Sequence, residues 1–263
     1  MIYKKWTTNN PDSVLLLVHG MGAHSARWNF LADFFIKNNI SSYSIELKGF
    51  GETPGLKGHI DSFKIYYKDI LELLEIIKKE NPGKNVFLLS ESMGSLIAFM
   101  MAIKHPSLFD GLICISPAFA NGMKIEIPDT IKMVMAAIYN PKKQFTIPFN
   151  SQMCTRDVEY QKIMDSNPLE HRLASARLLI NIIFEQIRSN LLKNKINIPV
   201  LFLLAGKDML VSPKASRAIF KGLKINDKTL IEYPEMYHAL SIELGREKVF
   251  QDILDWIKKR NVV

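Results

Sequence analysis

The chain of 263 residues is long enough for one large domain or a domain with an insertion, and its 48% hydrophobic residues provide a sizeable core. No apolar run approaches the roughly 20 residues of a membrane-spanning helix, and the run at 14–18 is too short for a signal peptide, so we expect a cytoplasmic protein. The net charge of +8 comes from lysines spread along the chain without a dense basic run, which argues against a nucleic-acid partner.

The first 120 residues alternate short apolar runs with helical patterns. Strands are expected at 13–18, 40–47, 85–90 and 111–117, and helices at 27–39, at 62–80 and directly after Ser92. The stop "NPG" at 81–83 is a good helix terminator. Continuous apolar strands separated by helices predict a parallel sheet that is covered on both faces.

The alternation breaks at residue 121. Residues 121–196 show only helices and loops, with no convincing strand. A strand at 198–205, a helix near 213–223, a strand at 228–234 and a helix at 245–260 then resume the pattern. We therefore predict an α/β core made of residues 1–120 and 197–263, interrupted by a helical cap insertion at 121–196.

Reactive residue types follow four of the expected strands, where open α/β sheets collect their catalytic groups. The loop His19–Gly22 follows the first strand, and Ser92, Asp208 and His238 each follow a later one. Taken singly, Ser92 or Asp208 could cap a helix and His238 could be an ordinary histidine. Together, in this chain order, they predict a nucleophile, an orienting acid and a base.

The stretch "LLSESMGSLIAF" predicts a strand, a tight turn at Ser92 and a helix. Such a nucleophile turn should be strained, with positive φ at the serine, and its flanking residues must be small. Gly94 meets this need, and Ser90 must find a hydrogen bond in the space that a glycine would leave empty. The backbone N–H groups of Met93 and Met21 are placed to form an oxyanion hole.

The loop "HGMGAHSARW" resembles the HGxGEHSxRY loop of the monoacylglycerol lipase and lysophospholipase branch of the α/β-hydrolases, which are serine aminopeptidase S33-type hydrolases. Further similar stretches are "ELKGFGETPG", "HIDSFKIYYKDI", "CTRDVEY" with "NPLEHR", "IPVLFLLAGKDMLVSP" and "YPEMYHAL". The resemblance implies an α/β-hydrolase fold, a mostly parallel sheet with helices on both faces and a helical cap. It also implies a serine esterase of lipid metabolism with the catalytic triad Ser92, Asp208 and His238, the oxyanion donors Met21 and Met93, and no metal or cofactor.

Four residues depart from the family pattern without removing a catalytic group. They are Ser90 for glycine, Ala23 for glutamate, Glu46 for aspartate and Thr53 for serine. His19 is expected to be structural, folded beneath the oxyanion loop. The departures leave the expected chemistry intact and bear on substrate detail.

The substrate is expected to be a small acyl ester, either a monoacylglycerol or a lysophospholipid-like ester. In the helix expected at 127–139, Ile131, Val134, Met135 and Ile138 share one apolar face, which could pack on the core, line an acyl tunnel or dip into a lipid surface. Leu179 belongs to a second apolar helix that could form a wall of the pocket. We expect Ile131, Met135, Ile138 and Leu179 to bind substrate.

Two other functions remain open at this stage. An amidase or prolyl aminopeptidase on the same fold would need cap carboxylates to hold the substrate amine, and five are available: Glu126, Asp129, Asp157, Glu159 and Asp165. A non-catalytic small-molecule receptor or scaffold is the second alternative, against which the complete triad argues. The segment Gly20–Gly22 does not indicate a dinucleotide site, because the third glycine of that pattern is missing.

Overall fold

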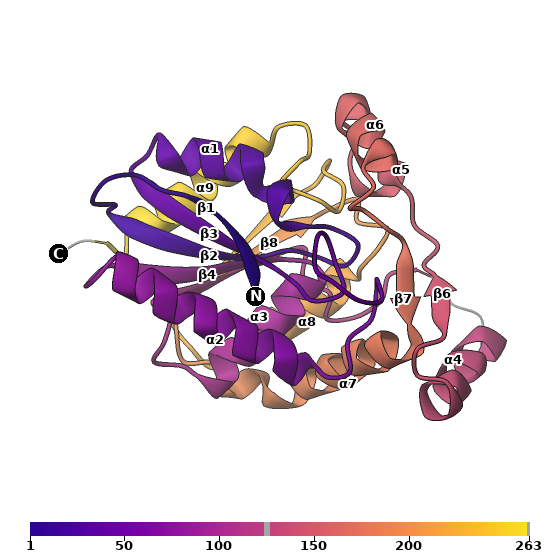
Figure 1. The fold of residues 1–263 in the computed structure, drawn as a ribbon. Helices are drawn as coiled ribbons and strands as arrows, with labels where there is room; N and C mark the ends of the chain where they lie inside the picture. Colours follow the sequence, from indigo (N-terminus) through magenta and orange to yellow (C-terminus); the bar gives the residue numbers. More distant parts are fainter. Residues whose placement is uncertain (124–126, 262–263) are drawn as a thin grey trace.

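The computed structural model describes residues 1–123 and 127–261, with side chains from Thr130 onwards in the second range. Within them, seven strands form one sheet in the order β1-β3-β2-β4-β5-β8-β9 (Figure 1). Their bounds are Ile2–Trp6 for β1, Ser13–Val18 for β2, Ile40–Glu46 for β3, Asn85–Glu91 for β4, Gly111–Ile115 for β5, Val200–Ala205 for β8 and Lys228–Tyr233 for β9. Neighbouring strands are parallel, except that β1 runs antiparallel to β3. The predicted α/β fold is confirmed.

The edge strand β1 was not predicted from the sequence. Its sequence "IYKKW" carries two lysines, and none of its residues is fully buried. A continuous apolar run marks only strands that are covered on both faces, so a half-exposed edge strand lacks that signal.

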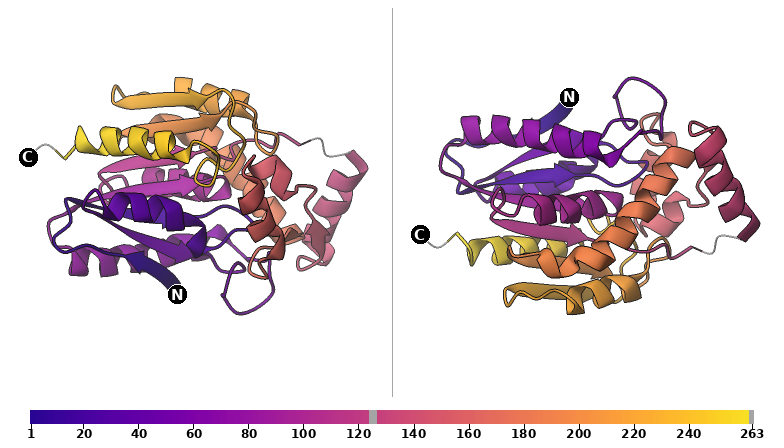
Figure 2. Two further views of the ribbon diagram at one scale, coloured as in Figure 1. Left: turned by 90° about the horizontal axis from the view of Figure 1, so that it is seen from above. Right: turned by 90° about the horizontal axis from the view of Figure 1, so that it is seen from below.

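Helices cover both faces of the sheet, as Figure 2 shows. On one face α1 (Asn29–Ile36) and α9 (Arg246–Lys258) pack over β2 residues such as Leu15 and Leu17. On the other face α2 (Phe63–Glu80), α3 (Met93–Lys104) and α8 (Pro213–Lys221) pack over Val14 and Leu16. The strict alternation of β2 side chains between two cores explains why the strand is apolar throughout.

The elements between β5 and β8 begin beyond one end of the strands, and the longest of them runs back beside α3 on one face of the sheet (Figures 1 and 2). They are α4 (Ile127–Tyr139), β6 (Gln144–Thr146), α5 (Ser151–Cys154), α6 (Val158–Ser166), β7 (Leu173–Ser175), α7 (Ala176–Leu192) and the 3-10 turn Lys193–Lys195. The prediction that this segment holds no strand is wrong, because β6 and β7 form an antiparallel pair. Strands of three residues are too short to show a periodicity.

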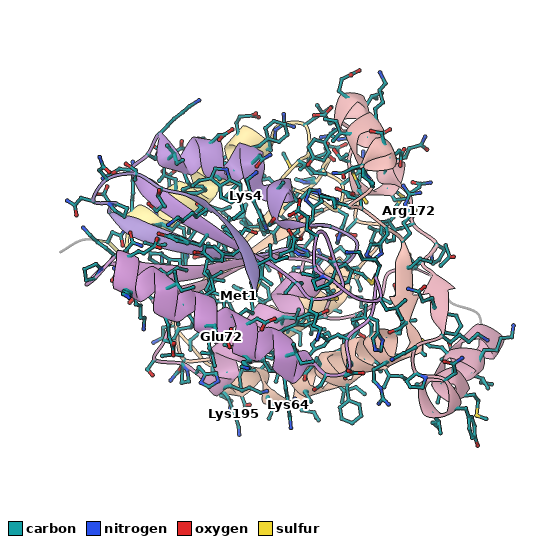
Figure 3. All side chains as sticks on the ribbon, in the orientation of Figure 1. Met1, Lys4, Lys64, Glu72, Arg172 and Lys195 are labelled. Carbon is teal, nitrogen blue, oxygen red and sulfur yellow. The ribbon has the colours of Figure 1, made fainter. Side chains whose placement is uncertain are left out.

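The positive charge is dispersed over the fold. Figure 3 labels Lys4 on β1, Lys64 on α2 and Lys195 in the turn after α7, three elements that are far apart in the sequence. Within the part of the chain that the structure describes, no helix is both long and apolar enough to cross a membrane.

Candidate active site

Ser92 occupies the turn between β4 and α3, with φ 57° and ψ −122°. Positive φ is costly for a residue with a side chain, so the turn is held by its surroundings. The Ser92 side chain makes no capping hydrogen bond to α3, which removes the helix-cap alternative. The predicted strained turn is therefore confirmed.

Tight packing surrounds this turn. A Cβ added at Gly94 would lie 2.3 Å from the carbonyl oxygen of Val18, so only glycine fits there. Ser90 is fully buried, and its Oγ lies 3.1 Å from the carbonyl oxygen of Ile113 and 3.2 Å from Ser95 Oγ. The hydrogen bond expected for Ser90 is thus present.

The histidine and the aspartate meet through a direct hydrogen bond. His238 Nδ1 lies 2.8 Å from Asp208 Oδ2. The other oxygen of Asp208 accepts the N–H groups of Leu210 and Val211, which fixes the carboxylate, and α8 is capped instead by Ser212. Burial disfavours the charged imidazole, but the carboxylates of Asp208 and, to a smaller extent, Glu91 favour it, and the pKa of His238 is raised above 6.5.

The loop after β2 lies against the Ser92 turn. A Cβ added at Gly20 would lie 3.1 Å from Ser92 Cβ, which shows how closely the backbone approaches the serine. Met93 begins α3, so its N–H has no partner within the helix. Both Met21 and Met93 line the same cavity as Ser92.

His19 supports this loop from below. Its Nδ1 lies 2.8 Å from the carbonyl oxygen of Gly20, and the N–H of Leu47 donates to its Nε2 at 3.1 Å. Burial lowers the pKa of His19 to about 3. The ring is therefore a neutral structural bridge, as the sequence predicted.

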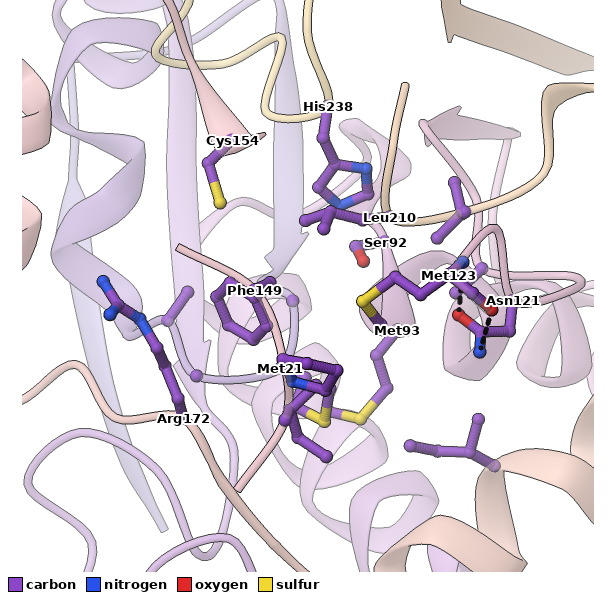
Figure 4. A pocket seen from close by; sticks show the side chains of 18 of the residues that line it. Met21, Ser92, Met93, Asn121, Met123, Phe149, Cys154, Arg172, Leu210 and His238 are labelled. Atoms are coloured by element: carbon purple, nitrogen blue, oxygen red, sulfur yellow. Dashed lines mark hydrogen bonds between the residues drawn. The ribbon is translucent and has the colours of Figure 1, made fainter. Parts of the chain in front are cut away.

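A cavity of about 1240 Å³ opens above Ser92 and His238. Figure 4 shows the Ser92 hydroxyl beneath the His238 ring, with the side chains of Met21, Met93 and Met123 gathered beside it. The apolar lining residues, which we call the apolar part, include Met21, Met93, Met123, Met133, Leu179 and Ile182. The polar lining residues, which we call the polar part, include Arg27, Glu91, Ser151, Asp165, Glu170 and Arg172.

The predicted substrate residues separate into two groups. Leu179 lines the cavity. Ile131, Met135 and Ile138 are 58%, 47% and 67% exposed, and they are not among the described residues of its lining. From α4, the cavity receives Met133 and Thr130 instead, so the opposite side of that helix faces the site.

The polar part of the cavity contains residues that sequence reasoning did not select. Arg27 is 6% exposed and pairs with Glu170 of the segment between α6 and β7, with 2.6 Å between Nη2 and Oε2. Among the residues that the structure describes, none provides a hydrogen-bond partner for Arg27 Nε, which is itself buried. Ala23, where the family pattern has glutamate, also lines the cavity, and Glu170 supplies a carboxylate beside Arg27. The missing glutamate at Ala23 could have indicated that a carboxylate comes from elsewhere in the chain. The residues around Ala23 gave no indication that this carboxylate is Glu170.

The cap carboxylates considered for an amine site are mostly engaged elsewhere. Asp157 pairs with Arg246, Glu159 with Lys162, and neither is among the described lining residues. Asp165 does line the cavity, where its carboxylate pairs with Arg172 at 2.6 Å. Glu126 and the side chain of Asp129 lie outside the described residues. In residues 1–123 and 127–261, no group of three or more His, Cys, Asp and Glu side chains is arranged to hold a metal ion.

Comparisons with known proteins match this architecture over nearly the whole chain. The family model described as "Serine aminopeptidase, S33" matches residues 9–245. The chain is 30% identical to the monoglyceride lipase of Homo sapiens over 96% of its own length and 84% of that protein. It is 25% identical to phospholipase YtpA of Bacillus subtilis, covering 94% of this chain and 95% of that one. The crystal structure of the Paleococcus ferrophilus monoacylglycerol lipase superposes with a TM-score of 0.90 at 26% identity, covering 98% of each chain.

Proposed function

The chain belongs to the serine aminopeptidase S33 family, in the monoglyceride lipase-like branch of the α/β-hydrolases, and is a serine ester hydrolase; we propose that it cleaves monoacylglycerols through an acyl-enzyme on Ser92. The observation that carries this proposal is the juxtaposition of the strained Ser92 turn with a His238–Asp208 pair at one end of a largely apolar cavity. A nucleophile, a base and an acid that fixes the base are then together.

The proposed reaction has two halves, formation of the acyl-enzyme and its hydrolysis, and the same groups act in both. His238 takes the Ser92 proton as Oγ attacks the ester carbonyl carbon, and the N–H groups of Met21 and Met93 stabilise the oxyanion. The ester C–O bond breaks, and the imidazolium gives its proton to the departing alcohol oxygen. Water, deprotonated by His238, then attacks the acyl carbon, which releases the fatty acid and restores the serine. Asp208 holds the tautomer of the base throughout.

The polar part of the cavity favours a neutral alcohol over a phosphate-bearing headgroup. Arg27 pairs with Glu170 and Arg172 with Asp165, each at 2.6 Å, so both guanidinium charges are already balanced. The described lining residues include no lysine. We therefore place monoacylglycerol before a lysophospholipid.

The test is hydrolysis of an acyl-length series of monoacylglycerols beside lysophosphatidylcholine and peptide anilides. We expect monoacylglycerol turnover, with kcat lowered at least about 10³-fold in Ser92→Ala. A fluorophosphonate probe should label the wild-type chain and not the variant. Full activity in Ser92→Ala would refute the nucleophile, turnover of anilides alone would favour an aminopeptidase, and an unlabelled wild-type chain would favour a receptor.

We further propose that the outer face of α4 contacts the lipid surface that holds the substrate. Ile131, Val134, Met135 and Ile138 are all exposed on this face, and Lys142 follows the helix. A short apolar face with nearby lysines suits an anionic interface. Binding to anionic vesicles should fall in Ile131→Ser/Ile138→Ser, while hydrolysis of a dissolved short-chain ester stays unchanged; equal vesicle binding by this variant would contradict the contact.

A further inference from the structure

Glu91 is a buried carboxylate directly before the nucleophile. It ends β4, is 4% exposed and lines the cavity together with Ser92 and His238. An acidic side chain is rarely buried without a reason, because removal from water disfavours its charge. The triad described above does not use it.

The hydrogen bonds of Glu91 lead to the loop that carries the base. Its two carboxylate oxygens accept the backbone N–H of Ser241 at 3.2 Å and the Ser241 hydroxyl at 3.1 Å. Ser241 lies three residues after His238, and the residue is fully buried. The Glu91 side chain thus joins the end of β4, which precedes Ser92, to the loop after β9, which carries His238. In the proposed mechanism Ser92 and His238 must stay aligned with each other.

The charges around His238 come from three elements. Asp208 after β8 and Glu91 at the end of β4 both favour the imidazolium, and Arg27 from the 3-10 turn Ser25–Trp28 opposes it. Burial raises the pKa of Glu91, while Arg27, His238 and the two Ser241 donors favour its charged form.

The remaining neighbours of this group are neutral or already paired. Burial raises the pKa of Cys154 on α5 to about 12, and burial also raises the pKa of Tyr160 on α6. Glu170 is paired with Arg27. Near the base in sequence, Glu235 pairs with Lys207 at the surface, where water screens both charges.

We propose that Glu91 is a positioning residue for the base: it anchors the His238 loop to the nucleophile turn through Ser241, and its negative charge stabilises the imidazolium formed during acyl transfer. The proposal rests on ester hydrolysis at Ser92, as proposed above. His238 becomes charged as it takes the serine proton, so a second buried carboxylate acts when the positive charge appears. Asp208 fixes the tautomer, and Glu91 contributes charge and loop position.

The experiment compares Glu91→Gln with the wild-type chain in the pH dependence of kcat/KM and in an NMR titration of the His238 imidazole. Glutamine removes the charge and can still make two hydrogen bonds with Ser241, because its amide oxygen accepts the backbone N–H and its NH2 group donates to the Ser241 hydroxyl oxygen. We expect the pKa of His238, and with it the acid limb of the profile, to fall by about 0.5 unit or more. Plateau kcat should fall about threefold to tenfold with little change in KM.

Three variants separate charge from structure. Glu91→Asp keeps the charge, so the acid limb should stay near its wild-type position even if loop contacts weaken. Ser241→Ala removes one hydrogen bond but no charge, and Glu235→Gln removes an exposed charge three residues before the base; neither should move the limb. Thermal unfolding of each variant reports whether it folds.

The outcomes distinguish this inference from the proposed function. An NMR pKa of His238 that is unchanged in Glu91→Gln would overturn the inference, as would an equal shift in Glu235→Gln. An inactive wild-type chain would instead refute the ester hydrolysis on which the inference rests, and the NMR titration would still report the charge effect on His238.

Discussion

The core and the cap of this molecule differ in which side chains they bury and which they expose. In the core the reactive groups are buried and fixed, with His238 6% exposed and bonded to an aspartate that is itself held by two backbone N–H groups. In the cap, apolar side chains face outward, with Ile138 67% and Phe184 65% exposed. The candidate catalytic residues of the core are held in place by hydrogen bonds, whereas many exposed apolar side chains lie on the helices of the cap.

The two regions meet at the polar part of the cavity. Arg27 pairs with Glu170, the Asn167 amide donates to His24 Nε2 at 2.9 Å, and the N–H of His171 donates to the Gly22 carbonyl at 3.3 Å. The cap segment 167–171 is thus docked on the loop that carries the proposed oxyanion donor. Loosening this contact should affect substrate binding before it affects the triad.

The largest effect should come from the core. In Gly94→Ala the new Cβ would lie 2.3 Å from the Val18 carbonyl oxygen, so β2 and the Ser92 turn must separate. We expect the free energy of unfolding to fall by about 3 kcal/mol or more, or the chain to fail to fold. Ser90→Gly is the matched control, with a loss of about 1 kcal/mol from its hydroxyl contacts. Denaturant unfolding measures both, and a wild-type midpoint for Gly94→Ala would contradict the packing argument.

The contact between cap and core comes next. Glu170→Gln removes the partner of a buried guanidinium, and we expect a loss of about 2 kcal/mol together with faster hydrogen exchange in residues 167–172. The control Glu159→Gln removes an exposed cap carboxylate, 81% accessible at its side chain, and should change stability by less than about 0.5 kcal/mol. Equal effects of the two variants would show that the pair does not hold the cap.

The pH dependence of kcat/KM tests His238 in the core and does not involve the cap. The proposed mechanism needs neutral His238, whose pKa is raised above 6.5, so kcat/KM should fall as the pH drops through a value above 6.5. His19, with its pKa lowered to about 3, stays neutral over this range and adds no second step. A dissolved short-chain ester gives the profile without interference from lipid ionisation, and an acid limb below 6.5 would contradict the assignment.

The smallest effect should come from the outer face of α4. Ile138→Ser should change the free energy of unfolding by less than about 0.5 kcal/mol, because the side chain is already exposed. On the inner side, Met133→Ser should lower turnover of long-chain esters about threefold or more, because Met133 lines the cavity and is 8% exposed. The ratio of long-chain to short-chain kcat/KM for each variant measures which side of the helix faces the substrate.

Buried parallel strands and the residues that follow them could be predicted from the sequence, because such strands are continuously apolar and their carboxyl ends meet at one edge. That reasoning reached Ser92, Asp208 and His238. It did not decide what Ile131 and Ile138 contact, because periodicity identifies an apolar face but not what covers it. Glu170 was also missed, since its partner Arg27 lies 143 positions earlier in the chain and only the fold brings them together.

The cavity is lined by both apolar and polar side chains, which bears on the order of events in the proposed reaction. Once the acyl group is bound covalently to Ser92, the alcohol is free to leave the cavity, whose polar lining includes Arg27 and Glu170. Whatever enters that vacated space next becomes the acyl acceptor. Water gives a fatty acid, whereas a second neutral polyol would give a new ester, so the partition between hydrolysis and acyl exchange depends on which of the two occupies the cavity beside the acyl-enzyme.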